Sequence, residues 1–180
     1  NGTVRGTQEI GAGRGNFTAT LGFAPNFGFQ ATGIGDLNGD GIIDLAISAI
    51  SDNSGNNSFG AVYILFMNRN GLVQSHQKIS NSTGNFTLPF SSQGSSFGTG
   101  LANIGDIDGD GLPELAVGAR NDPDGGSQRG AVYIISPKSD GVLRRATKIS
   151  NTSGNFTFPL INATLFGSSV AGIGDLDGDG

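Results

Sequence analysis

The sequence predicts an all-β fold built from four-stranded antiparallel units that repeat in tandem. Three observations support this prediction: 32 glycines among 180 residues, short apolar runs between turn residues, and motifs that recur about every 70 residues. Glycine at this level, with β-branched and aromatic runs between the glycines, is typical of many turns joining short strands. No segment shows the 3.6-residue periodicity of an amphipathic helix.

The repeat is defined by five blocks that recur in the same order. These are a Phe-Gly pair, an acidic loop, Gly-Ala-Val-Tyr-Ile, Lys-Ile-Ser and Gly-Asn-Phe-Thr. We therefore expect the end of one unit at 1–26, complete units at 27–96 and 97–165, and the start of a further unit at 166–180. Because the sequence begins and ends inside a unit, we expect it to be a window from a longer chain.

Each unit is expected to hold four strands, which the middle copy places near 97–104, 114–119, 131–136 and 145–150. Four antiparallel strands in every repeat are typical of a β-propeller blade or of a related β-solenoid. A closed propeller needs about 4–8 blades. The sequence therefore leaves two arrangements, a closed ring completed by further repeats or an open stacked array. The alternating apolar residues within 86–90 and 156–160 suggest an extra edge strand in each linker.

Charge is concentrated in the three acidic loops. The net charge is −5, yet 10 of the 15 acidic residues lie in these loops, so the rest of the chain is net positive by five. No basic stripe is present, which argues against a nucleic-acid partner. No apolar run reaches the 18 residues that a membrane span needs. The chain has no cysteine, which excludes a disulfide scaffold.

The acidic loops have the spacing of calcium ligands. In the first loop, oxygen-bearing side chains stand at positions 1, 3, 5 and 9, a glycine stands at position 6, and position 7 can offer its backbone carbonyl. Calcium takes roughly 6–8 oxygen ligands at about 2.3–2.6 Å in a loose geometry, whereas magnesium prefers a smaller octahedron that keeps several waters. The candidate ligands are Asp36, Asn38, Asp40, Ile42 and Asp44, then Asp106, Asp108, Asp110, Leu112 and Glu114, then Asp175, Asp177 and Asp179. We expect one Ca²⁺ in each complete loop.

These loops differ from an EF-hand, which has the same side chains at positions 1, 3 and 5 but a glutamate at position 12. Position 12 here is Ile47 or Val117, and the last acidic residue stands at position 9, where a strand begins. We therefore expect a turn between two strands rather than a helix–loop–helix.

The order of Phe-Gly, acidic loop, [DE]-L-A-[IV] and G-A-V-Y-I resembles the FG-GAP repeat of integrin α-subunit β-propellers. The resemblance covers nearly the whole chain. It implies a four-stranded blade for each repeat, with calcium in the loop that joins the first two strands, and so the same ligands as above. Two departures are that Glu114 replaces the usual aspartate and that the proline of the Gly-Ala-Pro motif is missing.

Acceptor sequences for N-glycosylation are unusually frequent. The chain holds eight Asn-x-Ser/Thr sequences, about three times the number that its composition gives by chance. Several recur at the repeat period, which favours N-linked glycans along one stripe of a secreted protein, although copying of a polar turn with the repeat would also explain them. The acceptors are Asn1, Asn16, Asn56, Asn81, Asn85, Asn151, Asn155 and Asn162.

The sequence assembles no catalytic group. His76 is the only histidine and is not repeated, and the clustered acids are already assigned to calcium. We expect His76 on the surface, and Arg144, Arg145 and Lys148 on a solvated, charged edge.

The leading hypothesis is a non-enzymatic extracellular protein, secreted or on the cell surface, with a structural or adhesive role. Its partners would be neighbouring repeats, identical chains in a fibre, or extracellular protein or glycan ligands. The alternatives are an integrin-like ligand-binding propeller and a non-catalytic module of a larger surface enzyme.

Overall fold

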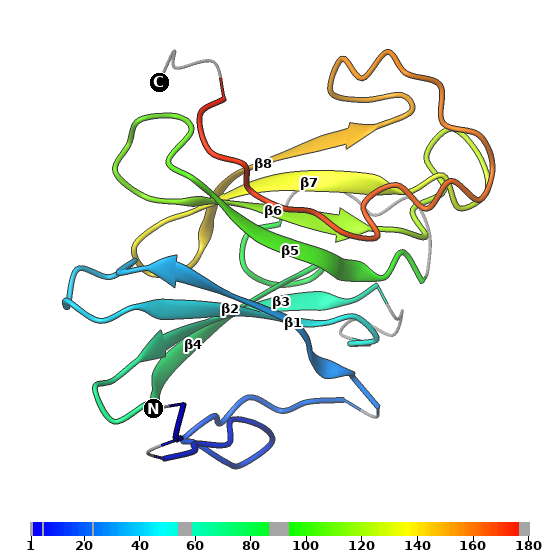
Figure 1. Cartoon of the computed structure of the whole chain (residues 1–180). Coiled ribbons are helices and arrows are strands. Elements are labelled where there is room, and N and C mark those ends of the chain that lie inside the picture. Colours follow the sequence, from blue (N-terminus) through cyan, green and yellow to red (C-terminus); the bar gives the residue numbers. More distant parts are fainter. Residues whose placement is uncertain (1, 5, 23, 54–58, 87–93, 177–180) are drawn as a thin grey trace.

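The fold consists of two four-stranded antiparallel sheets that lie face to face (Figure 1). This computed structural model describes residues 2–4, 6–22, 24–53, 59–86 and 94–176. The first sheet contains β1 (Phe27–Gly35), β2 (Asp44–Ala49), β3 (Ala61–Met67) and β4 (Val73–Ser80), and the second contains β5 (Phe97–Gly105), β6 (Glu114–Ala119), β7 (Ala131–Pro137) and β8 (Leu143–Ser150). In each sheet, chain neighbours pair in order, so the two sheets have the same topology.

The all-β class and the four strands of each unit are confirmed. The strands predicted from the middle copy agree with β5 to β8 to within two residues at each end. Within the described ranges no residue is helical, and none of them offers a helix that could span a bilayer.

The proposed extra edge strand is wrong where it can be examined. Residues 154–161 form turns and irregular chain, with Leu160 buried and Phe158 exposed. The other copy, at 87–93, lies outside the described residues. The alternation at 156–160 therefore reflects single apolar contacts of an irregular segment, such as the burial of Leu160, and not the two faces of a strand.

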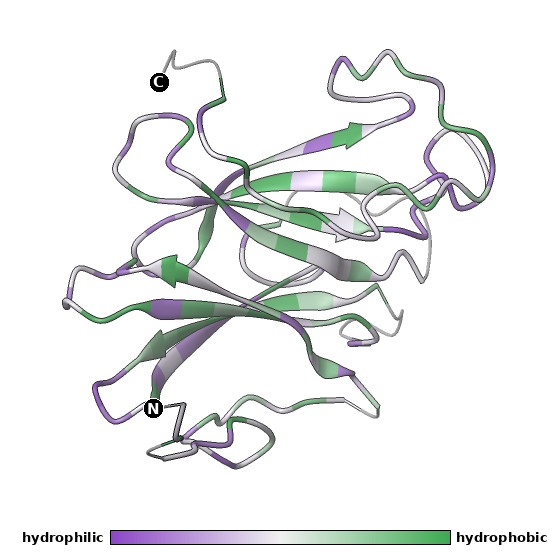
Figure 2. Ribbon diagram, in the orientation of Figure 1, coloured by the Kyte–Doolittle hydropathy of each residue, from purple (hydrophilic) through white to green (hydrophobic). Residues whose placement is uncertain are grey.

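The central strands are buried on both faces, and their side chains alternate between two cores. Along β3, Val62, Ile64 and Phe66 belong to the core between the sheets, whereas Tyr63 and Leu65 belong to a second core on the far side. Successive residues of a strand point to opposite faces, so a continuous apolar run requires cover on both sides. Figure 2 shows much of β3 and β7 in apolar colour, whereas the loops mix polar and apolar colours.

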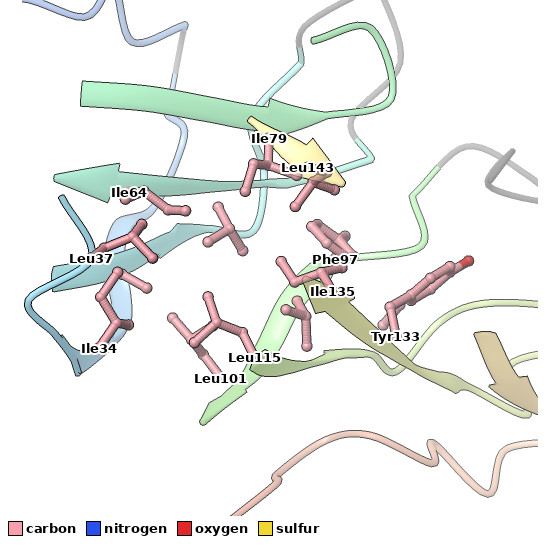
Figure 3. Close-up of a cluster of buried hydrophobic side chains, with 14 of the residues drawn as sticks. Ile34, Leu37, Ile64, Ile79, Phe97, Leu101, Leu115, Tyr133, Ile135 and Leu143 are labelled. Atoms are coloured by element: carbon pink, nitrogen blue, oxygen red, sulfur yellow. The ribbon is translucent and has the colours of Figure 1, made fainter. Parts of the chain in front are cut away.

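The core between the sheets is made by side chains that converge from both of them (Figure 3). Ile34 and Leu37 from the first sheet and its loop point toward Leu101 and Leu115 of the second, and all four are at most 6% exposed. The first strand of the first sheet, β1, is mostly exposed, whereas its counterpart in the second sheet, β5, is mostly buried. The two strands differ because β5 packs against β1, β2 and β3 of the first sheet. Burial of each first strand therefore depends on the preceding sheet.

The far side of the first sheet is covered by residues 10–21. Phe17 is fully buried there, stacked on Phe27 at 4.8 Å between ring centroids and edge-on to Tyr63 at 5.5 Å. One repeat later, Phe86 packs against the matching rings of Phe97 and Tyr133, both in a tilted arrangement. The phenylalanine of each Gly-Asn-Phe motif thus packs the end of one unit against the aromatic core of the next.

Each sheet also holds a buried ion pair that the sequence did not reveal. Lys148 Nζ lies 2.9 Å from Asp122 Oδ1, and the Tyr133 hydroxyl donates to Asp122 Oδ2 at 2.9 Å. The first sheet repeats the arrangement with Lys78, Asp52 and Tyr63. Lys148 is therefore not part of a solvated edge, because its charge is matched by a buried carboxylate.

Candidate metal sites

The first acidic loop joins β1 to β2 at one end of the first sheet and is closed by its own first residue. Asp36 Oδ1 accepts hydrogen bonds from the backbone N–H groups of Gly39 (2.8 Å) and Asp40 (2.9 Å), and Asp36 Oδ2 accepts one from Gly41 (2.7 Å). Asp40 Oδ1 accepts one from the N–H of Ile42 at 2.9 Å. These bonds wind the loop around the first carboxylate.

Two glycines make the loop possible, and only one of them was expected. Gly41 at position 6 has φ +81°, as the predicted bend requires, and Gly39 at position 4 has φ +80°. Both values lie in the left-handed region that glycine enters without a steric penalty. In the second loop Gly109 and Gly111 have φ +75° and +88°. The second glycine could have been found from the sequence, since position 4 is glycine in every copy.

The second loop repeats the geometry of the first. Asp106 accepts from the N–H groups of Gly109 (2.8 Å), Asp110 (3.1 Å) and Gly111 (2.7 Å). Asp110 accepts from the N–H of Leu112 at 2.9 Å. The two loops therefore share one backbone conformation although their side chains differ at positions 3 and 9. This indicates that the loop conformation is a property of the repeat and does not depend on those two side chains.

The acidic residue at position 9 is buried in both loops. Asp44 is fully buried and accepts hydrogen bonds from the N–H groups of Leu37 (3.1 Å) and Met67 (2.9 Å). Burial raises the pKa of Asp44, an effect opposed by these two backbone hydrogen bonds and reinforced by the nearby charges of Asp40 and Asp36. Glu114 is 1% exposed and accepts from the N–H of Ile107 at 2.9 Å.

The carboxylates of the second loop converge on one point. Asp106, Asp108 and Glu114 each place an oxygen within 4.8 Å of the other two. Glu114 therefore reaches the group despite its extra methylene, because its backbone starts β6 directly beneath the loop. The loop offers oxygen donors, most of them exposed, together with the oxygens of a buried carboxylate. Calcium binds such hard oxygen ligands in a flexible geometry, whereas soft metals prefer sulfur ligands.

Residues 27–65 and 97–135 match a family model described as FG-GAP repeat. Each match begins at a Phe-Gly pair, spans one acidic loop and ends in the third strand. The chain belongs to the FG-GAP repeat family. The repeated loops of this structure are therefore the acidic loops of FG-GAP repeats.

Curated relatives of this FG-GAP chain carry integrin names. Integrin alpha-PS5 of Drosophila melanogaster is 36% identical over 146 residues, which is 81% of this chain and 13% of the relative. Integrin alpha-5 of Xenopus laevis is 32% identical over 169 residues, 87% of this chain and 14% of the relative. Integrin alpha-6 of Homo sapiens is 31% identical over 157 residues, which is 87% of this chain and 12% of the relative. The chain thus spans only 12% to 14% of the length of these relatives.

The third acidic loop of the FG-GAP chain can be followed only at its start. The segment 166–176 first runs alongside β5 and then turns away from it (Figure 1), and its Asp175 is exposed. Asp177 and Asp179 lie outside the described residues. This segment begins as β5 does: Phe166 pairs with Gly130 through a parallel bridge, just as Phe97 pairs with Gly60.

A basic residue that the sequence placed on a solvated edge enters the second loop. Arg144 Nη2 on β8 lies 2.5 Å from Asp108 Oδ2, 2.9 Å from Asp110 Oδ2 and 3.7 Å from Glu114 Oε1. The prediction of a purely solvated role for Arg144 is wrong. It failed because β8 and the β5–β6 loop are distant in the sequence, and only the sheet brings them together.

Most of the glycosylation acceptors that the structure describes are exposed. Three of them, Asn16, Asn85 and Asn155, occupy the same left-handed turn, with φ between +54° and +60°. Asn151 is half-buried, and its Oδ1 accepts from the N–H of Leu160 at 2.9 Å. The exposed acceptors are Asn16, Asn81, Asn85, Asn155 and Asn162. Asn1 and Asn56 lie outside the described residues.

Proposed function

We propose that this chain is a calcium-binding stretch of FG-GAP repeats in a non-enzymatic, N-glycosylated extracellular protein with an adhesive or structural role. The repeats would be divided as the sequence suggests, at 27–96 and 97–165, with partial repeats at 1–26 and 166–180. The chain would lie outside the cell, secreted or at its surface. The observation that carries this proposal is the common geometry of the two loops, each with a buried carboxylate at position 9.

Calcium would act on the rigidity of the repeat. The ligands would be Asp36, Asn38, Asp40, Asp44 and the carbonyl of Ile42 in the first loop, and the matching residues in the second. Crowded carboxylates repel one another unless a cation neutralises them. A bound Ca²⁺ would tie the exposed loop to the buried carboxylate that begins the second strand. Since binding to the folded state alone stabilises that state, calcium would raise the free energy of unfolding.

The adhesive role rests on the integrin names of the relatives. In an adhesive protein of this kind, rigid repeats would present loops on one face to an extracellular partner. A second candidate, a repeated structural unit of a fibre, is favoured by the contact between sheets. The same glycine–phenylalanine bridge is used at Gly60–Phe97 and again at Gly130–Phe166, so identical contacts could extend along an array.

Calcium titration by calorimetry tests the proposal. We expect the wild-type chain to bind at least two ions, and the double variant Asp36→Asn/Asp40→Asn and its counterpart Asp106→Asn/Asp110→Asn to lose one ion each. Glu9→Gln, at an exposed glutamate outside the acidic loops, serves as the control and should bind as the wild type does. Equal stoichiometry in all variants, or no binding to the wild type, would contradict the proposal.

The two architectures differ in the native material. Electron micrographs of the whole protein would show long filaments for a fibre unit and separate particles for an adhesion receptor. Either outcome leaves the calcium sites to be judged by titration alone.

A further inference from the structure

We infer that Arg144 is a built-in competitor for the cation of the second FG-GAP loop, so that the second site binds calcium more weakly than the first. The inference rests on the proposed calcium sites. It concerns a difference between two loops that share one backbone conformation, and it makes the two sites respond at different calcium concentrations.

The guanidinium of Arg144 contacts the oxygens that a cation would need. It lies 2.5 Å from Asp108 Oδ2 and 2.9 Å from Asp110 Oδ2, and it is 3.7 Å from Glu114 Oε1. These carboxylates stand at positions 3, 5 and 9 of the loop. The positive charge of the arginine next to these carboxylates stabilises the calcium-free loop. A divalent cation can bind the same oxygens only if it displaces the arginine, or if the two cations share the oxygens despite their mutual repulsion.

The side chain is well placed to compete because it is neither free nor fully buried. Arg144 is 39% exposed, and the side chains of Asp108 and Asp110 are 23% and 26% exposed. The guanidinium can therefore swing into solvent when calcium arrives. Partial exposure also keeps the attraction modest, since charges near the surface interact through water-like screening.

Among the residues that the structure describes, no basic side chain forms an ion pair with the carboxylates of the first loop. In the strand pairing, Val73 stands opposite Met67 as Leu143 stands opposite Pro137, so the residue that matches Arg144 is Gln74. Gln74 is exposed and uncharged. The first loop also has a neutral side chain at position 3, Asn38, whose Nδ2 donates to Asp40 Oδ2 at 3.2 Å. The first site thus has one carboxylate fewer than the second. The second site has the additional carboxylate of Asp108, and the Arg144 guanidinium is paired with it.

A neighbouring arginine supplies a matched control. Arg145 Nη2 lies 3.9 Å from Asp108 Oδ2, at the outer limit of an ion pair, and its side chain is 57% exposed. Arg145→Gln removes the same formal charge as Arg144→Gln, one residue away on the same strand. Any difference between the two variants therefore reports the position of the guanidinium and not the net charge of the chain.

The test is calcium calorimetry on chains in which one site is isolated. The second site is measured in the Asp36→Asn/Asp40→Asn background, with and without Arg144→Gln or Arg145→Gln. We expect Arg144→Gln to raise calcium affinity about tenfold and Arg145→Gln less than about threefold. In the Asp106→Asn/Asp110→Asn background, Gln74→Arg should lower the affinity of the first site about tenfold.

Thermal unfolding provides an independent readout. In the Asp36→Asn/Asp40→Asn background and without calcium, Arg144→Gln should have a lower midpoint than Arg145→Gln, because the carboxylates lose their counter-charge. Its midpoint should then rise further when calcium is added. Equal affinity of the second site with and without Arg144 would overturn the inference while leaving the proposed calcium sites intact. Absence of calcium binding in every variant would overturn the proposed function itself.

Discussion

A methyl group at Gly98 would lie 2.7 Å from Cβ of Ser48 on the preceding sheet. Ser48 cannot move aside freely, because its hydroxyl accepts a hydrogen bond from the N–H of Gln30 at 3.0 Å. Gly98 also has φ +100°, a conformation that other residues rarely adopt. The glycine of the Phe-Gly pair is therefore required both by its own backbone and by the approach of the two sheets.

We predict that Gly98→Ala destabilises the chain more than Gly28→Ala, its counterpart in the first repeat. Gly28 has φ +86°, but no atom of the described residues lies within 4 Å of the added methyl group. Backbone strain alone should cost about 1 kcal/mol at Gly28, and strain plus the clash should cost about 3 kcal/mol at Gly98. Chemical unfolding in excess calcium measures both. Equal losses would show that the sheets adjust without cost.

The buried ion pair of the second sheet yields a second prediction. Lys148→Met should lower the free energy of unfolding by about 3 kcal/mol, because it leaves the buried carboxylate of Asp122 without its cation. Adding Asp122→Asn should recover part of this loss, since the neutral amide tolerates burial better than the charge. Lys138→Met, at an exposed lysine, is the control. A double variant less stable than Lys148→Met would refute the pairing.

Local and periodic features of this fold could be predicted from the sequence, and contacts across the sheets could not. The four strands, the loop between the first two and the bend at Gly41 follow from short apolar runs, turn residues and ligand spacing. The carboxylate partners of Arg144 and Lys148 lie more than twenty residues away and depend on strand register. Exposure does not follow from sequence either, because Leu37 is buried beneath the next sheet while the matching Ile107 is 52% exposed.

His76 illustrates the same point and yields a prediction on pH. Its ring packs on Phe17 at 5.1 Å between centroids and is half-buried, so His76 reaches the surface only in part. Burial lowers the pKa of His76 below its usual 6.5. The unfolded chain therefore binds this proton more readily than the folded chain does, and stability present above pH 6.5 is lost as the pH falls toward the lowered pKa.

The variant His76→Phe should be less sensitive to this acidification, because it keeps a ring against Phe17 without a titrating group. Urea unfolding at about pH 7.5 and about pH 5.5, in saturating calcium, measures the change. A fall in stability that is the same in the variant and in the wild type would mean that His76 does not contribute to it.

The exposed acceptor Asn155 should carry a glycan when the chain is secreted from eukaryotic cells. Thr157→Ala should reduce the mass by one glycan, whereas Thr147→Ala, at an exposed threonine outside any acceptor sequence, should not. Asn151 should remain unmodified, because it is half-buried and hydrogen-bonded to the Leu160 backbone. Mass spectrometry of glycopeptides before and after enzymatic deglycosylation distinguishes the sites. An unmodified Asn155 in secreted material would count against the glycosylated stripe.

The central claim is that calcium stabilises the acidic loops, and thermal unfolding with and without a calcium chelator tests it most directly. The account predicts that the midpoint falls by several degrees when calcium is removed and recovers when excess calcium, but not an equal concentration of magnesium, is restored. A midpoint that is the same in calcium and in chelator would contradict it.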